Sequence, residues 1–329
     1  MTELTRRSLL AGTAVAGAAL SLEGFSFARA AAPAATAQAP GFYRQKVGDY
    51  EVTALSDGAR TFPMPDTFVV NKKKDEALAA AEGAYMPKGQ VTIPFNPVVV
   101  NTGSKLIVID TGNGLGAFEQ TKGAAGQMSA NMKAAGIDPN AVDIVLISHF
   151  HGDHIGGLRM PDGKLTYPNA EIMVPAPEWA FWSDEANAAK ANGFNKGNFP
   201  TVKKVFDGLA DKVTKFEWGK EVAPGITSIA TPGHTPGHTS FAIASGNGKL
   251  LVQSDVTNIP ALFLRNPDWH VVFDNDPELA QATRHKFYDM ASVDRTAVAG
   301  YHFSFPALGH VEKDGAGYRL VPAAWNPAI

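Results

Sequence analysis

Cysteine is absent from the 329 residues of this chain. The chain therefore has no disulfide, no thiolate ligand for a metal and no cysteine nucleophile. The absence agrees with a protein that is exported already folded and needs no oxidative pairing.

Long runs of basic residues are also missing. The chain has 29 Lys and Arg against 32 Asp and Glu, and its formal net charge is −3. A nucleic-acid-binding surface needs a basic run or stripe, so no nucleic-acid partner is expected. The motif G-x-S-x-G is absent as well, and a serine-hydrolase mechanism therefore has no support.

Long apolar runs are scarce, and the first one is short. Residues 5–10 read T-R-R-S-L-L, a twin-arginine pattern, and the small apolar residues 9–22 and the A-R-A site at 28–30 follow. An uncleaved membrane anchor is the alternative, but a span needs ~20 apolar residues. We therefore expect residues 1–30 to be a twin-arginine signal peptide. Its removal leaves a periplasmic or secreted protein with no stable membrane anchor.

The remaining chain divides into a linker and a folded part. Residues 31–41 are rich in Ala and Pro and are predicted to be a disordered linker. Residues 42–329 are predicted to form a single domain, with a second half of strands that starts near Lys215.

The chain is organised around the segment S-H-F-H-G-D-H-I-G-G at residues 148–157. The apolar, β-branched run 141–147 directly precedes it and is predicted to be a buried strand. The segment therefore lies where a strand ends and a loop begins, which is where open α/β sheets bind ligands.

The spacing within this segment predicts metal binding. Side chains two residues apart in extended backbone point to the same side, so His149 and His151 are predicted to bind one ion together. Gly152 permits a sharp turn, after which the adjacent Asp153 and His154 are predicted to face a second ion.

Three later segments supply further candidate ligands. They are T-P-G-H-T-P-G-H at 231–238, the apolar run ending in Asp at 250–255, and V-A-G-Y-H-F at 298–303. This order of motifs resembles the metallo-β-lactamase superfamily of hydrolases. The stretch from His302 to Pro322 resembles one branch of it closely, the exported methyl parathion hydrolase type and its lactonase relatives.

The resemblance and the repeated order of strands followed by ligands predict the fold class α/β (α+β). The expected architecture is an αββα sandwich, with two mixed β-sheets, helices on the outer faces and the site along one edge.

The resemblance implies a centre of two divalent metal ions. The implied ligands are His149, His151 and His234 for the first ion, Asp153, His154 and His302 for the second, and Asp255 as the bridge. Zn²⁺ is the expected metal, with Fe, Co, Mn and Ni as alternatives. A hydroxide between the ions is the implied nucleophile, and Asp153 and Asp255 are the candidate catalytic residues for proton transfer.

Two further residues are implied to support the site. Asp110, in the sequence D-T-G, is implied as a buried support of the metal loop, with a plain turn-forming role as the alternative. His238 is implied to pack and hydrogen-bond behind the site. His270 and His285 have no motif context and are predicted to be surface residues.

Aromatic residues after the metal loop are candidates for a substrate pocket. Trp179 and Trp182 lie in a helix-like segment at 177–190, and Phe194 lies in a Gly/Asn-rich stretch, 191–200, predicted to be a loop. Such residues pack in the core by default, but an apolar substrate pocket is the alternative. Phe118 is the fourth candidate.

The complete ligand set is the pattern of lactonases, arylesterases and organophosphate triesterases within the superfamily. We therefore predict an exported binuclear hydrolase of small apolar lactones or aryl esters, and of phosphotriesters as further substrates. The alternatives are another hydrolase of this fold, acting on β-lactams or thioesters, and a periplasmic metal-binding protein without catalysis. Relatives are often dimers, so the resemblance also admits a homodimer.

Overall fold

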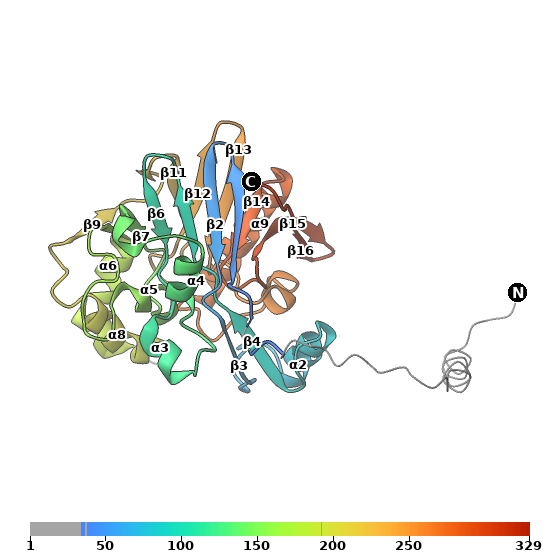
Figure 1. Cartoon of the computed structure of the whole chain (residues 1–329). Coiled ribbons are helices and arrows are strands. Elements are labelled where there is room, and N and C mark those ends of the chain that lie inside the picture. Colours follow the sequence, from blue (N-terminus) through green and yellow to red (C-terminus); the bar gives the residue numbers. More distant parts are fainter. Residues whose placement is uncertain (1–33, 37, 192) are drawn as a thin grey trace, which may run out of the picture. The chain divides into compact units, whose positions relative to one another are not determined.

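The computed structural model describes residues 34–36, 38–191 and 193–329 (Figure 1). The expected signal peptide lies outside the described residues. From Pro40 to Ile329 the chain forms one compact unit. Within the described residues, no helix combines the length and the apolar composition that crossing a bilayer requires.

The first sheet is mixed, and its seven strands are neighbours in chain order. They are β1 (Phe42–Val47), β2 (Tyr50–Leu55), β5 (Val98–Asn101), β6 (Leu106–Ile109), β7 (Ile144–Leu146), β8 (Glu171–Pro175) and β9 (Val213–Phe216). The strands from β1 to β6 pair antiparallel, and those from β6 to β9 pair parallel. The central strand β7 directly precedes the metal loop.

The second sheet is also mixed and follows chain order. Its strands are β10 (Glu221–Ala223), β11 (Ile226–Ala230), β12 (Thr239–Ser245), β13 (Gly248–Ser254), β14 (Ala297–Gly300), β15 (Leu308–Asp314) and β16 (Gly317–Pro322). Only β13 and β14 pair parallel. A separate hairpin is formed by β3 (Ala59–Pro63) and β4 (Gln90–Pro94).

The helices surround this pair of sheets. They are α2 (Lys74–Gly83), α3 (Leu115–Gln120), α4 (Met128–Ala134), α5 (Gly152–Ile155), α6 (Ala176–Trp182), α7 (Glu185–Lys190), α8 (Gly193–Val205) and α9 (Pro277–Val293). Short 3-10 turns occur at Pro139–Ala141 and Gly156–Leu158, and a π-helical turn at Pro260–Leu264.

Three apolar layers follow the two sheets, and a fourth apolar cluster lies where the β3–β4 hairpin meets α2 and the Pro260–Leu264 turn. Between the sheets, Val98 and Val100 of β5 pack in one cluster with Phe241 and Ile243 of β12. Val99 belongs to the opposite layer, because successive strand residues point to opposite faces.

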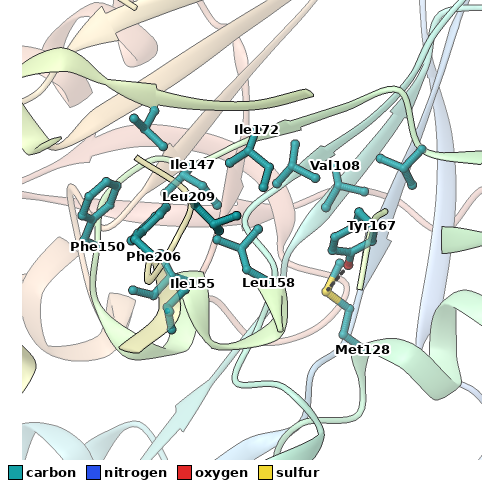
Figure 2. Close-up of a cluster of buried hydrophobic side chains, with 14 of the residues drawn as sticks. Val108, Met128, Ile147, Phe150, Ile155, Leu158, Tyr167, Ile172, Phe206 and Leu209 are labelled. Carbon is teal, nitrogen blue, oxygen red and sulfur yellow. Dashed lines mark hydrogen bonds between the residues drawn. The ribbon is translucent and has the colours of Figure 1, made fainter. Parts of the chain in front are cut away.

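The two outer layers lie under helices. On the first sheet, Val108 and Ile172 pack with Met128 of α4, and the Tyr167 hydroxyl contacts the Met128 sulfur (Figure 2). On the second sheet, strands β13 and β14 pack against α9. The predicted αββα sandwich of two mixed sheets is therefore confirmed.

The structure corrects three local predictions. Residues 191–200 were predicted to be a loop, but from Gly193 they belong to helix α8, whose Phe199 and Val202 face the core. The helix expected at 177–190 is two helices, and Asp184 caps the second by accepting a bond from the Ala186 amide. The strand near Lys215 belongs to the first sheet, because β9 pairs with β8.

Substitution of Gly157 tests how the metal loop packs. A Cβ atom on Gly157 would lie 1.9 Å from the carbonyl oxygen of Thr111. We expect Gly157→Ala to lower the free energy of unfolding by about 1–3 kcal/mol, because backbone must move apart. Chemical denaturation measures this change. Gly116→Ala is the matched control, since its new Cβ meets no atom within 4 Å. Equal unfolding midpoints for Gly157→Ala and the wild type would contradict the expectation.

Candidate metal centre

The candidate ligands follow the ends of strands that belong to both sheets. His149 and His151 come after β7, and His151 is the residue before α5, which contains Asp153 and His154. The other three follow strands of the second sheet: His234 lies between β11 and β12, Asp255 follows β13, and His302 follows β14. Both sheets therefore contribute ligands at one edge of the sandwich.

The structure brings all seven candidate ligands together. The sets whose ligand atoms lie within 4.8 Å of one another are His149, His151 and His234; His149, His154 and Asp255; and Asp153, His154 and His302. The first and third sets match the two groups that the sequence implied.

Asp255 lies between the two groups. One of its carboxylate oxygens is 3.3 Å from Nε2 of His234 and 2.9 Å from Nε2 of His302. The other oxygen is 3.2 Å from Nε2 of His154. A carboxylate with histidines of both groups against its two oxygens is in the position that a bridging ligand needs.

Unsatisfied buried atoms test whether the residues fit metal ions. The Nε2 atoms of His149, His151 and His154 and the Oδ1 atom of Asp255 are buried without a hydrogen-bond partner. Leaving such atoms unpaired costs about 1–3 kcal/mol each. The Nε2 atoms of His149 and His154 lie 4.0 and 3.2 Å from the Asp255 carboxylate, and Nδ1 of His151 lies 2.9 Å from Nε2 of His234. Imidazole nitrogen with carboxylate oxygen suits divalent transition metals. The residues therefore fit a bound cation.

The electrostatics of the site also favour a cation. Burial lowers the pKa of His149 and of His151 well below its usual value, so both rings are neutral and able to coordinate. On His154 burial is outweighed by nearby carboxylates, above all Asp255, which raise its pKa well above its usual value. Burial is outweighed at Asp255 too, where His302 and His154 hold the pKa well below its usual range. The centre thus attracts positive charge.

Hydrogen bonds at Nδ1 orient three of the rings. His154 bonds Asp110 at 2.8 Å, His234 bonds Asp274 at 2.8 Å, and His302 donates to the carbonyl oxygen of Pro94 at 2.8 Å. A proton held at Nδ1 leaves the Nε2 lone pair free for a metal.

Asp110 also holds the start of the metal loop. Its two oxygens accept bonds from the backbone amide and the hydroxyl of Ser148, at 2.8 and 2.7 Å. The side chain is buried. These contacts are those of a support for the metal loop, as the sequence implied, rather than of a turn alone.

His238 lies behind Asp255 and outside the three ligand sets. Its Nδ1 donates to the carbonyl oxygen of Thr231 at 3.0 Å, and its Nε2 accepts from the Asp255 amide at 3.0 Å. Burial lowers the pKa of His238 to about 3, so the ring is neutral, as this acceptor role requires.

Glu178 is a support that the sequence did not reveal. One oxygen accepts from the Phe150 amide at 2.9 Å and the Trp182 indole at 2.7 Å. The other accepts from the Thr235 hydroxyl and the Gly237 amide, both at 2.8 Å. One buried carboxylate therefore joins the loop of His149 and His151 to the loop of His234. The only sequence signal was an acidic residue within an aromatic helix.

Asn96 supports the segment that contains the ligand His302. Its side-chain amide donates to the carbonyl oxygens of Tyr301 and Phe303, which flank His302. The Tyr301 hydroxyl in turn donates to the carbonyl oxygen of Asp153. These contacts tie the last ligand to the metal loop.

Five of the seven candidate ligands, all except His149 and His154, line a cavity of about 720 Å³. Its lining includes five phenylalanines, namely Phe62, Phe68, Phe95, Phe194 and Phe273. Phe194 is thus placed as expected, and its ring lies 5.0 Å from that of His151.

The other predicted pocket residues lie elsewhere, which is a correction. Trp179 and Trp182 line a second cavity of about 580 Å³, and residues of helix α8 line both this cavity and the metal-side one. The Trp182 ring lies 6.2 Å from that of His151 but does not line the metal-side cavity. Phe118 lines neither cavity and is 39% exposed.

The two histidines without motif context are not both on the surface. His270 is buried and donates to the side-chain oxygen of Gln281, so the surface prediction for it was wrong. His285 is half-buried and bonds Asp268.

Glu178→Gln tests the support of the first ligand group. The substitution keeps the shape of the side chain but replaces one acceptor oxygen with an NH₂ group. That group then faces N–H or O–H donors and cannot accept hydrogen bonds from them. We expect the affinity for the first zinc ion to fall by about 10–100-fold. Competition with a chelator measures this affinity, and Glu185→Gln on the exposed face of α7 is the control. A variant that binds zinc as the wild type does would show that Glu178 does not position these ligands.

His238→Ala tests whether His238 stabilises the site without binding a metal ion itself. We expect it to lower the free energy of unfolding by about 1–3 kcal/mol, because the buried Asp255 amide loses its acceptor. Metal content, measured by elemental analysis, should stay at the wild-type level. Loss of metal from a variant with unchanged unfolding behaviour would refute this role.

Comparison with known proteins places the chain in a family. A family model described as the metallo-beta-lactamase superfamily matches residues 95–302, which include all seven candidate ligands. The N-acyl homoserine lactonase AttM of Agrobacterium fabrum is 32% identical over 123 residues, 37% of this chain and 43% of that protein. The match thus spans less than half of that relative. The N-acyl homoserine lactonase AiiA of Bacillus thuringiensis subsp. kurstaki is 25% identical over 67% of this chain and 85% of its own length.

Two solved structures share the fold along most of the chain. AidC, a dizinc quorum-quenching lactonase, has a TM-score of 0.80 and 27% identity, over 87% of this chain and 98% of its own. The hydrolase AbOPH has a TM-score of 0.79 and 28% identity, over 88% and 100%. With the ligand geometry and the matched region together, the chain belongs to the metallo-beta-lactamase superfamily.

Proposed function

We propose that this protein is a two-metal hydrolase that opens lactones of the N-acyl homoserine lactone class. The observation that carries the proposal is the position of Asp255 between two ligand groups at an aromatic cavity. The similarity to AttM, AiiA and AidC, which are lactonases by name, supports the substrate class. AidC is dizinc, which supports Zn²⁺ as the metal.

Two bound divalent cations would supply Lewis acidity and lower the pKa of water towards ~7. In lactone hydrolysis, water adds to the ring carbonyl, the ester C–O bond breaks and the leaving oxygen takes a proton. Asp153 lines the cavity, and its side chain is 22% exposed, whereas that of Asp255 is 4% exposed. We assign it the transfer of this proton, whereas the buried Asp255 holds the two groups together.

The cavity wall suits an apolar part of the substrate. Its phenylalanines offer contact to an acyl chain or an aryl ring. Arg60 is the only Lys or Arg among the lining residues, and it is exposed. A phosphate monoester would favour several such cations, so neutral esters fit better. Aryl esters and phosphotriesters are further candidate substrates, because they are also neutral and apolar.

A substrate panel with metal-replete enzyme tests the proposal. The panel contains N-hexanoyl homoserine lactone, dihydrocoumarin, phenyl acetate, paraoxon and a cephalosporin, and kcat/KM is measured for each. We expect the highest value for a lactone and a zinc content of two ions per chain. Asp255→Ala should lose at least about 10²-fold in kcat/KM, since it removes a ligand of both groups rather than a supporting contact.

Asp162→Ala, at an exposed aspartate, is the matched control and should keep wild-type activity. Turnover of the cephalosporin alone would replace the proposal with a β-lactamase. Two bound ions with no turnover of any compound would leave a metal-binding protein without this catalysis.

A further inference from the structure

Arg284 is a buried cation that has no role in the metal centre as described above. It lies on α9, is 1% exposed and is among the largest fully buried side chains. A guanidinium remains charged in proteins, so burial requires full compensation by hydrogen bonds and opposite charge. An arginine retained at such a place needs a reason beyond packing.

The partners of Arg284 are three carbonyl oxygens and one carboxylate. It donates to Val256 at 3.0 Å, to Pro267 at 2.6 Å and to Trp269 at 3.0 Å. Its remaining terminal nitrogen lies 3.4 Å from an oxygen of Asp274, which is also buried. The guanidinium thus joins three separate backbone positions and one buried anion.

Each of these partners is close to the metal centre along the chain. Val256 is the residue after Asp255. The segment from Pro267 to Asp274 includes Val272 and Phe273, which line the metal-side cavity. Asp274 itself bonds Nδ1 of His234 through its other oxygen at 2.8 Å.

The backbone reinforces the same connection. The amide of Asn275 donates to the carbonyl oxygen of His234 at 2.9 Å, and the amide of Asp276 donates to that of Gly233 at 2.9 Å. The loop of His234 is therefore held along its side chain and its main chain by the segment that Arg284 anchors.

We propose that Arg284 is a positioning residue for the first metal. Through Asp274 it sets the orientation of the His234 ring, whereas the bridging Asp255 is held separately, because its amide donates to Nε2 of His238. The histidines of the second group have other supports, Asp110 for His154 and Pro94 for His302. Loss of Arg284 should therefore weaken the two metal affinities unequally. This inference rests on the proposed two-metal centre but not on the lactone substrate.

Stepwise zinc binding to the chelator-treated protein tests the inference. The two binding constants are measured by competition with a chromophoric chelator, and His234→Ala and His302→Ala identify which constant belongs to which group. We expect Arg284→Met to weaken the constant of the His234 group by about 10–100-fold and the other by less than threefold. Arg284→Lys keeps the charge but not the fork of donors, so it should recover part of the loss.

Two further variants keep the test decisive. Asp274→Asn keeps the size of the side chain and removes its charge, so it should weaken the same constant even if Arg284→Met does not fold. Lys286→Met, two residues along α9 and exposed, is the matched control and should leave both constants unchanged. Equal weakening of both constants, or wild-type constants in Arg284→Lys and Asp274→Asn, would reduce Arg284 to a structural role and overturn the proposal.

Discussion

The carboxylate of Asp255 lies between two groups of histidines, and the arrangement of the rest of the site depends on this contact. Its oxygens lie 3.3 Å from His234, 2.9 Å from His302 and 3.2 Å from His154. Several of the converging ligand atoms are buried and have no partner in the protein. Such a cluster is unfavourable on its own, because desolvated lone pairs cost free energy. The fold therefore builds a place that a cation completes.

This convergence depends on buried polar residues that are not ligands themselves. Asp110, Glu178, Asn96 and the pair Arg284–Asp274 each form hydrogen bonds to a segment of the site other than their own. Each one joins loops that follow different strands, so that the loops cannot move independently. Rigid support of this kind keeps ligand nitrogens in one orientation, which metal binding requires. Burial of the apolar layers above and below the sheets stabilises the fold and offsets the cost of burying these polar groups.

The relation between sequence and structure differs from one element to another. The run 141–147 predicts β7 because it is apolar and β-branched, and the spacing of His149 and His151 places two ligands on one side of an extended segment. Helix α8 escaped prediction because Gly and Asn dominate its start, and its helical conformation is favoured by burial of Phe199 and Val202 in the core. Trp179 and Trp182 line a second cavity that this helix also lines, and not the metal-side cavity.

By itself, the sequence determined the ligand types, their order along the chain and the αββα class. The spacing within each motif depends on a few residues, which local chemistry governs, whereas the ligand assignment and the fold class came from the resemblance of the order of these motifs to that of a known superfamily. Only the tertiary structure decided which residues hold those ligands and which aromatics line the cavity. Asn96 and Tyr301, for example, meet across 205 residues of chain. Contacts of that kind leave no local pattern, because they arise only when two sheets and their helices pack together.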